Sequence, residues 1–169
     1  MPISKTLQSF LDKNKIKYEV VEHKIVYTAH DKAATLHVKP NIVGKTMVMV
    51  FDKKHYMIGL IPANKNLDKK KVLIAFNNLR KKAGERGYKK IDFAKESWMK
   101  KTFKGIDVGA TPPFSSFYNL PFFIDNSLIK QTKIIVNGGK YNLSLKISPA
   151  NLLKLNPQAI KGDFSQAKK

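Results

Sequence analysis

The segment that most constrains the fold is GKTMVMVFDKKHYMIGLIP, residues 44–62. It contains two runs of β-forming residues joined by a charged turn at residues 52–54, and this is the pattern of a β-hairpin. Both runs are almost entirely apolar, which predicts that the hairpin occupies a central position in a sheet. The fold of this chain must therefore be built around these two strands.

Further strands are predicted on both sides of this hairpin. Residues 16–23, IKYEVVEH, alternate in polarity, and LPFFID at residues 120–125 is a short apolar run. Residues 133–147 form two alternating runs around the triplet NGG at residues 137–139, whose members tolerate the positive φ of a tight turn. A second hairpin is therefore expected near the C-terminus.

Helical spacing and capping residues predict five helices. TAHD at residues 28–31 has the form of a capping box, and Ser148-Pro149 supplies an N-cap followed by proline at the first helical position. The expected helices begin after Ser4, after Thr28, after Asp68, at Phe93 (ending at Phe103) and after Ser148, and the second of them ends before Pro40. Hairpins combined with helices predict an α+β domain with a mixed, mostly antiparallel sheet.

Length and composition predict one soluble domain. The 169 residues contain neither an internal repeat nor an interdomain linker, and we expect residues 1–161 to form the domain and residues 162–169 a flexible basic tail. Cysteine is absent, so disulfides and thiolate metal sites are excluded. No apolar run resembles a signal peptide or a membrane span, which predicts a cytoplasmic protein without a membrane partner, most simply a monomer.

Charge is the strongest compositional signal. Thirty-two Lys and Arg against twelve Asp and Glu give a formal net charge of +20, which attracts polyanions. Most of the excess is lysine, which suits phosphate attraction better than base recognition, although a genome-wide compositional bias would also produce it. The helix after Asp68 should expose part of this charge, and its predicted nucleic-acid contacts are Lys69, Lys70, Arg80, Lys81 and Lys82.

Strongly specific catalytic motifs are absent from the sequence. It has no Walker A motif, no G-x-G-x-x-G, no H-E-x-x-H and no G-x-S-x-G. The four histidines lack the spacing of metal ligands, so we expect neither a metal nor another cofactor.

Two weaker candidates remain. Lys45 begins an apolar strand, where a lone ammonium can hold a phosphate or carbonyl oxygen in a pocket, although strand ends commonly expose a lysine. In GATPP, residues 109–113, glycine permits close approach of a ligand and the prolines stiffen the backbone, so the N–H groups of Ala110 and Thr111 could be preorganised donors. The same stretch equally suits a rigid connection between two elements.

Six segments, taken in their order along the chain, favour the ligand-binding interpretation of Lys45 and residues 109–113. They span about residues 5–160 and read EHKIVYTA (22–29), GKTMVMV (44–50), NLDKKKV (66–72), VGATPPF (108–114), LPFFIDNSL (120–128) and VNGGKYNLSLKISPANLL (136–153). In this order the chain resembles the YbaK and prolyl-tRNA-synthetase-associated family of aminoacyl-tRNA editing domains. The resemblance implies a partly barrel-like sheet surrounded by helices and hydrolysis of mischarged tRNA.

The resemblance also implies roles for individual residues. Lys45 corresponds to the family's pocket lysine, and Gly109 begins its G-x-x-x-P loop, which presents backbone donors to the aminoacyl ester; these two residues are the expected catalytic groups. The residues expected to bind substrate are Thr28, Ala110, Thr111, Pro113, Asn137, Gly138, Gly139 and Ser144.

Three positions depart from members that act on Cys-tRNA. Such members often carry an aromatic residue before Glu-His, a serine before the Gly-Gly turn and an acidic residue on the next strand, whereas this chain has Val21, Asn137 and Ser144 there. The resemblance as a whole implies a trans-editing deacylase of Cys-tRNA(Pro) or Ala-tRNA(Pro), with charged tRNA as its partner and a tRNA synthetase as a further candidate. A non-catalytic tRNA-binding module of the same fold is the alternative, and a DNA-associated protein ranks last because no helix-turn-helix or zinc signature is present.

Overall fold

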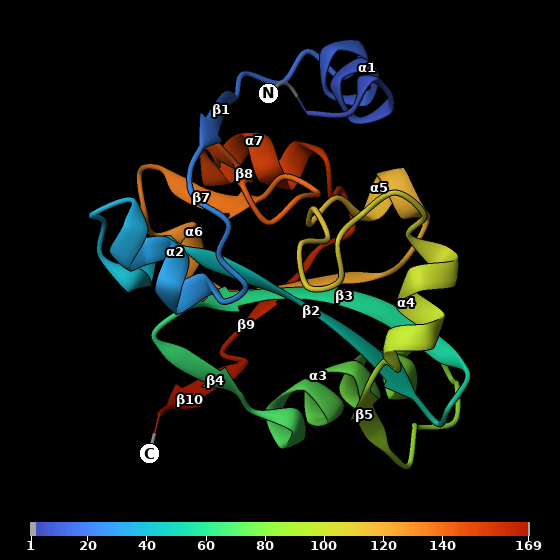
Figure 1. Ribbon diagram of the computed structural model, residues 1–169. Helices are drawn as coiled ribbons and strands as arrows, with labels where there is room; N and C mark the ends of the chain where they lie inside the picture. Colours follow the sequence, from blue (N-terminus) through green and yellow to red (C-terminus); the bar gives the residue numbers. More distant parts are fainter. Residues whose placement is uncertain (1–2, 169) are drawn as a thin grey trace.

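A five-stranded sheet occupies the centre of the computed structural model, which describes residues 3–168 (Figure 1). Its order is β5-β2-β3-β6-β9, so the hairpin β2–β3 is central, as its apolar sequence predicted. The hairpin pairs Gly44 with Pro62 at its open end and Phe51 with His55 at its turn. The strands are β2 (Gly44–Phe51), β3 (His55–Pro62), β5 (Ile91–Phe93), β6 (Phe122–Asp125) and β9 (Ile160–Gly162).

The two faces of this sheet bury different layers. Met49 and Phe51 belong to a core that also contains Val72 and Phe76 of α3 (Lys69–Lys82), and Figure 1 places α3 below the sheet. Val48 points the other way, into a larger core above the sheet. Strand alternation therefore separates α3 from the elements on the opposite face.

A second sheet lies above the first in Figure 1 and has the order β1-β8-β7. It comprises β1 (Glu19–Glu22), β7 (Ile134–Asn137) and β8 (Leu143–Ile147), and the expected hairpin around residues 137–139 joins the last two. An isolated bridge between Val43 and Ile135 connects the two sheets. Neither sheet closes on itself within residues 3–168, so the barrel-like character is limited to this contact.

Four of the five expected helices begin at the capping residue that the sequence indicated. The side chains of Ser4, Thr28, Asp68 and Ser148 each accept a hydrogen bond from the backbone N–H three residues later, at 3.2, 3.0, 3.2 and 3.1 Å. These residues start α1 (Lys5–Lys13), α2 (Ala29–Thr35), α3 and α7 (Pro149–Lys154). Local sequence thus determines where these helices begin.

The helix expected at Phe93 begins later than predicted. Residues 91–93 pair with β2 as strand β5, and α4 covers Glu96–Thr102. The sequence also gave no signal for η1 (Pro40–Ile42), α5 (Ser115–Tyr118) and α6 (Asn126–Ile129), because three or four residues are too few to display a helical period.

The flexible tail expected from residue 162 onward is wrong for residues 162–167. Phe164 is 1% exposed, and β10 (Ser165–Ala167) pairs with β4 (Lys65–Leu67). The buried carboxylate of Asp125 accepts hydrogen bonds from Phe164 N at 2.8 Å and Ser165 Oγ at 3.0 Å. The burial of Phe164 could not be predicted from the sequence, because a single aromatic residue shows no periodicity. Residue 169 of the expected tail, like residues 1 and 2, lies outside the described part.

Membrane insertion finds no support in the helices that the structure describes. None of those between residues 3 and 168 is long and apolar enough to cross a bilayer.

Candidate functional site

The loop at residues 107–111 is held by the β7–β8 hairpin. Gly139 N donates to Ala110 O at 3.0 Å, and Asp107 N donates to Gly139 O at 2.9 Å. The hydroxyl of Tyr141 donates to Val108 O at 2.7 Å, and its backbone N–H donates to the carboxylate of Asp107 at 2.9 Å. The two glycine motifs that the sequence singled out therefore form one rigid unit.

Asn137 ties the same loop to the sheet. Its Nδ2 lies 3.1 Å from Gly109 O, 3.4 Å from Thr111 O and 3.3 Å from Thr46 Oγ1. The side chain is 7% exposed, so these contacts form away from bulk water. Asn137 thus acts on the loop from beneath and is not only a turn residue.

This hydrogen bonding divides the loop into used acceptors and free donors. Every carbonyl oxygen of residues 107–111 accepts a hydrogen bond. Besides the contacts described above, Asp107 O accepts from Ala110 N at 2.9 Å in a tight turn. The N–H groups of Gly109 and Thr111, by contrast, have no acceptor within residues 3–168. Ala110 is therefore not the free donor expected from the sequence, and Gly109 takes that position. Its φ of +90° is one that L-residues rarely adopt.

A pocket next to Gly109 brings together five of the expected site residues. Its volume accessible to a water molecule is about 30 Å³, and the pocket opens to solvent. Expected residues among its lining are Thr28, Lys45, Gly109, Ala110 and Asn137, joined by Val26, Tyr27, Ala29, Lys32, Lys140 and Tyr141. The N-terminus of α2, the start of β2 and the end of β7 thus meet at one place.

Other expected site residues lie outside this pocket. Gly138 and Gly139 line a neighbouring, more apolar hollow, and their N–H groups are already bonded to Leu143 O and Ala110 O. Pro113 is buried, and its carbonyl accepts a hydrogen bond from Asn156 Nδ2 at 3.0 Å. These residues support the loop, and the free donors come from elsewhere.

Ser144 is also a support residue. It is completely buried, and its hydroxyl lies 2.8 Å from Nε2 of His23. His23 Nδ1 lies 2.7 Å from the carbonyl of Lys24 and must donate to it, so the neutral ring accepts from Ser144. Burial is the main cause that lowers the pKa of His23, and nearby Lys32 lowers it further, while the Lys24 carbonyl opposes both.

Lys32 is a pocket residue that was not expected from the sequence. It is 6% exposed, and its Nζ donates to Asn137 Oδ1 at 2.7 Å. Burial lowers its pKa to about 8, because the surrounding protein solvates the ammonium less well than water does. A signal was present, since Ala29, Lys32, Ala33 and Leu36 have the spacing of the inward face of a helix and only one of them is charged.

Lys45 reaches the same pocket from β2. It is half-buried, and its pKa is lowered first by burial and then by the positive charge of Lys168. A cation that is partly desolvated interacts more strongly with an anion or a polarised carbonyl than a fully hydrated cation does. Lys45 therefore lines the pocket as a partly desolvated cation.

An aromatic pair stands at the mouth of the pocket. Tyr27 is 72% exposed and packs edge-to-face on Tyr141, with ring centroids 4.8 Å apart. Because Tyr141 is fixed by its own hydrogen bonds to the loop, Tyr27 presents a supported aromatic surface to solvent.

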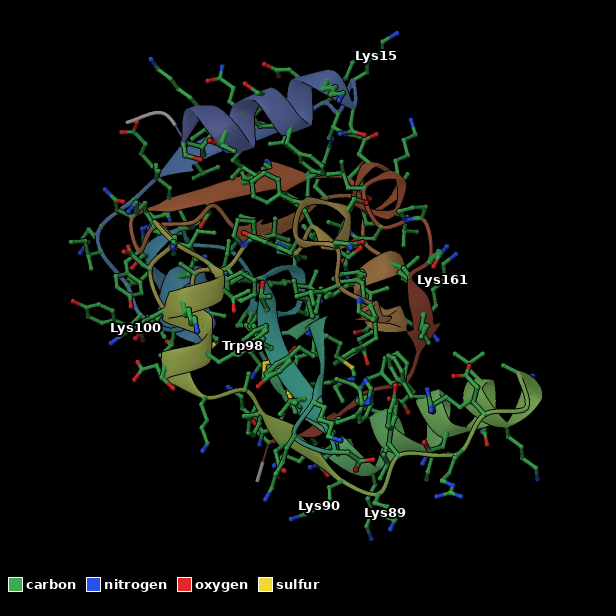
Figure 2. The ribbon with its side chains drawn as sticks, turned by 90° about the vertical axis from the view of Figure 1, so that its right-hand side faces the viewer. Lys15, Lys89, Lys90, Trp98, Lys100 and Lys161 are labelled. Atoms are coloured by element: carbon green, nitrogen blue, oxygen red, sulfur yellow. The ribbon has the colours of Figure 1, made fainter. Side chains whose placement is uncertain are left out.

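The basic residues expected on α3 lie across the central sheet from this pocket (Figure 1). Lys70, Lys81 and Lys82 are exposed, whereas Lys69 lies 4.5 Å from the ring centre of Phe93. Arg80 is engaged within the protein, where it donates to Arg86 O at 2.6 Å and pairs with Glu85 at 3.2 Å. Figure 2 shows lysines also projecting from other elements, among them Lys15, Lys89, Lys90, Lys100 and Lys161.

Metal ligation is not supported by the described side chains. Between residues 3 and 168, no group of three or more His, Asp or Glu residues is placed to hold a metal ion.

Comparison with known proteins identifies the family. The sequence profile described as the aminoacyl-tRNA editing domain matches residues 23–155, a range that contains every residue lining the pocket. EbsC of Enterococcus faecalis, named as a candidate Cys-tRNA(Pro)/Cys-tRNA(Cys) deacylase, is 24% identical over 148 residues, which cover 80% of this chain and 84% of EbsC.

Solved structures share the fold. The hypothetical protein APE2540 superposes with a TM-score of 0.74 at 20% identity, over 96% of this chain and 100% of the other. A candidate trans-editing enzyme for prolyl-tRNA synthetase superposes with a TM-score of 0.71 at 19% identity, over 98% of this chain and 100% of the other. The α+β architecture expected from the sequence is thus confirmed.

Proposed function

Because the chain belongs to the aminoacyl-tRNA editing domain family, we propose that it is a hydrolase that deacylates mischarged aminoacyl-tRNA. The observation that carries this proposal is the loop at residues 107–111, whose carbonyls are all bonded while Gly109 N–H is free beside Lys45. Cys-tRNA(Pro) and Ala-tRNA(Pro) are the first substrates to test, since the relative EbsC carries the name of a Cys-tRNA deacylase.

In the proposed reaction, water adds to the carbonyl carbon of the ester between the amino acid and the terminal adenosine. The carbonyl oxygen gains negative charge in this step, and the proposed stabilising donor is the N–H of Gly109, which lines the pocket and has no acceptor among the described residues. Collapse of the intermediate breaks the bond to the ribose oxygen, which takes up a proton, and releases the amino acid and the tRNA. The donor is preorganised because the loop's carbonyls are bonded to Asn137, Gly139 and Tyr141.

The pocket supplies no histidine or carboxylate as a general base, since its lining includes neither type of residue. The proposal therefore assigns the orientation of the water to the substrate's own ribose hydroxyl or amino group. Lys45 holds the carbonyl or the terminal nucleotide, and its partial burial strengthens that contact. Positioning and electrostatics, without a protein nucleophile, suffice for an ester that is already activated.

The polynucleotide would approach from the mouth of the pocket. Tyr27, exposed and supported by Tyr141, offers a face on which the terminal adenine can stack. Exposed lysines such as Lys140 at the rim and Lys70 on α3 would attract phosphates without reading sequence.

Deacylation assays with Cys-, Ala-, Ser- and Asp-charged tRNA test the proposal, so that small neutral and acidic side chains are both represented. We expect hydrolysis of at least one substrate by the wild type and a loss of about 100-fold or more in Lys45→Ala. The matched control is Lys54→Ala, which removes an exposed lysine from the turn of the same hairpin and should leave the rate unchanged. Background rates on every charged tRNA, together with tight and salt-sensitive tRNA binding, would indicate instead a non-catalytic tRNA-binding module.

A further inference from the structure

Lys32 places a positive charge in the pocket without a counter-ion. The side chain is 6% exposed, yet it makes no ion pair with any carboxylate of residues 3–168. Its one hydrogen-bond acceptor is the neutral Oδ1 of Asn137 at 2.7 Å, although an ammonium has three N–H donors. Burying a charge in this way is unfavourable unless something compensates for it.

The pocket around Lys32 is also suited to an anion. Lys45 and Lys140 line it together with Lys32, and neither Asp nor Glu is among the lining residues, although Lys140 pairs with Asp107 at 3.9 Å outside the lining. The three lysines differ in depth, since Lys32 is buried, Lys45 is half-buried and Lys140 is exposed. The outer two can meet the phosphates of a polynucleotide, whereas only a small group that enters the pocket can reach Lys32.

The side-chain amide of Asn137 connects Lys32 to the loop that is proposed to bind the ester. Asn137 accepts from Lys32 through Oδ1 and donates to Gly109 O through Nδ2, at 2.7 and 3.1 Å. Gly109 and Lys32 also line the same pocket, so an ester held at Gly109 has its amino-acid side chain in the space that Lys32 borders. The group best matched to an unpaired buried ammonium is a carboxylate.

We propose that Lys32 is the receptor for a carboxylate on the side chain of the esterified amino acid, so that the pocket takes tRNA charged with an acidic residue. Aspartate is the better fit, because the space beside Lys32 is small and aspartate has the shorter of the two acidic side chains. This inference rests on the proposed deacylase function and names its substrate class. A neutral side chain is disfavoured because it leaves the ammonium without an anion.

Binding of two non-hydrolysable amides tests the inference without relying on catalysis. The probes are 3′-aspartylamino-3′-deoxyadenosine and its asparaginyl counterpart, which differ only in the side-chain carboxylate. By calorimetric titration we expect the wild type to bind the aspartyl probe about tenfold or more tightly than the asparaginyl probe. The exposed-lysine control Lys54→Gln, in the turn of the central hairpin, should keep this preference.

Lys32→Gln is the decisive variant, because glutamine keeps an N–H donor for Asn137 and lacks the charge. It should bind both probes equally, and Lys32→Met serves as a second variant, each accepted only with a wild-type-like melting transition. The inference is overturned if the wild type shows no preference or no binding of the aspartyl probe, or if the preference persists in Lys32→Gln. The inference is also overturned if the affinity depends on a 5′-phosphate added to the probe and does not depend on the side-chain carboxylate.

Hydrolysis assays with Asp-tRNA and Asn-tRNA separate this inference from the proposed function. Carboxylate-selective binding without hydrolysis of any charged tRNA would support the assignment of Lys32 and reject the deacylase activity. Hydrolysis of Ala- or Cys-tRNA without a carboxylate preference would reject the assignment of Lys32 and leave the deacylase activity standing.

Discussion

The pocket and the outer face of α3 are both rich in lysine, but their lysines are in different physical states. On α3, Lys70 is exposed, and Lys71 is paired with Asp163 at 2.8 Å, which raises the pKa of Lys71. In the pocket, burial lowers the pKa of Lys32 and Lys45, and no described carboxylate pairs with either. The charge on the outer face of α3 is exposed to water, whereas the charges of Lys32 and Lys45 are partly desolvated in a pocket where a bound anion can neutralise them.

This difference shows that the net charge of +20 does not by itself locate a site. A hydrated lysine contributes to long-range attraction that salt screens, whereas a desolvated lysine acts over a few ångströms and selects what it touches. Residues that hold the pocket together should therefore matter far more than residues that only add charge.

The largest effect is expected from Asn137→Ala. This change leaves the ammonium of Lys32 and the carbonyls of Gly109 and Thr111 without their partner in a buried setting. We expect a loss of roughly 3–5 kcal/mol in the free energy of unfolding, measured by urea denaturation. Asn151→Ala, which removes an exposed contact at 3.4 Å, should cost far less, and equal costs for the two variants would contradict the buried network.

The pH dependence of stability should distinguish Lys32 from the lysines of α3. The pKa of Lys32 is about 8 in the folded protein against 10.5 as its ordinary value, so the unfolded chain binds more protons between these limits. Stability therefore rises with pH across this window, by up to about 3 kcal/mol for this group. Since burial also lowers the pKa of Lys45, the measurement compares the wild type with Lys32→Gln over this pH range, and parallel curves for the two proteins would contradict the assignment to Lys32.

A smaller effect on stability, with a large effect on activity, is expected from Gly109→Ala. Gly109 and Gly84 have φ of +90° and +73°, and a Cβ at either would meet nothing within 4 Å. Both substitutions should cost about 1–2 kcal/mol through backbone strain. Only Gly109→Ala should abolish deacylation, since Gly84 lies in the turn after α3. Equal activities of the two variants would argue against a role for the loop.

The smallest effect on chemistry is expected on α3. Replacing Lys70, Lys81 and Lys82 together by glutamine removes three exposed charges and leaves the pocket intact. The maximal rate should be unchanged, while tRNA affinity weakens and the slope of log affinity against log salt falls by about 2–3. Filter binding over a range of salt concentrations measures this slope, and an unchanged slope would place tRNA on another surface, such as the lysines in Figure 2.

Local patterns predicted the elements more reliably than the contacts between them. The central hairpin and the four capped helices were correct because period, turn residues and caps act over a few positions. The burial of Phe164 and the pairing of β10 with β4 were missed, since they depend on segments about 100 residues apart. Ala110 was wrongly expected to offer a free N–H, because a turn to Asp107 consumes it.

The family, the central hairpin and the presence of Lys45 and Gly109 in the pocket lining follow from short motifs in a fixed order along the chain. Which side chains are buried together, and which hydrogen bonds they make, depended on the tertiary structure. It buried Lys32 against Asn137 and left it without a described carboxylate, and it bonded the carbonyls of the loop while leaving Gly109 N–H free. Desolvation and hydrogen-bond satisfaction are set by neighbours brought together in space, and no local pattern specifies them.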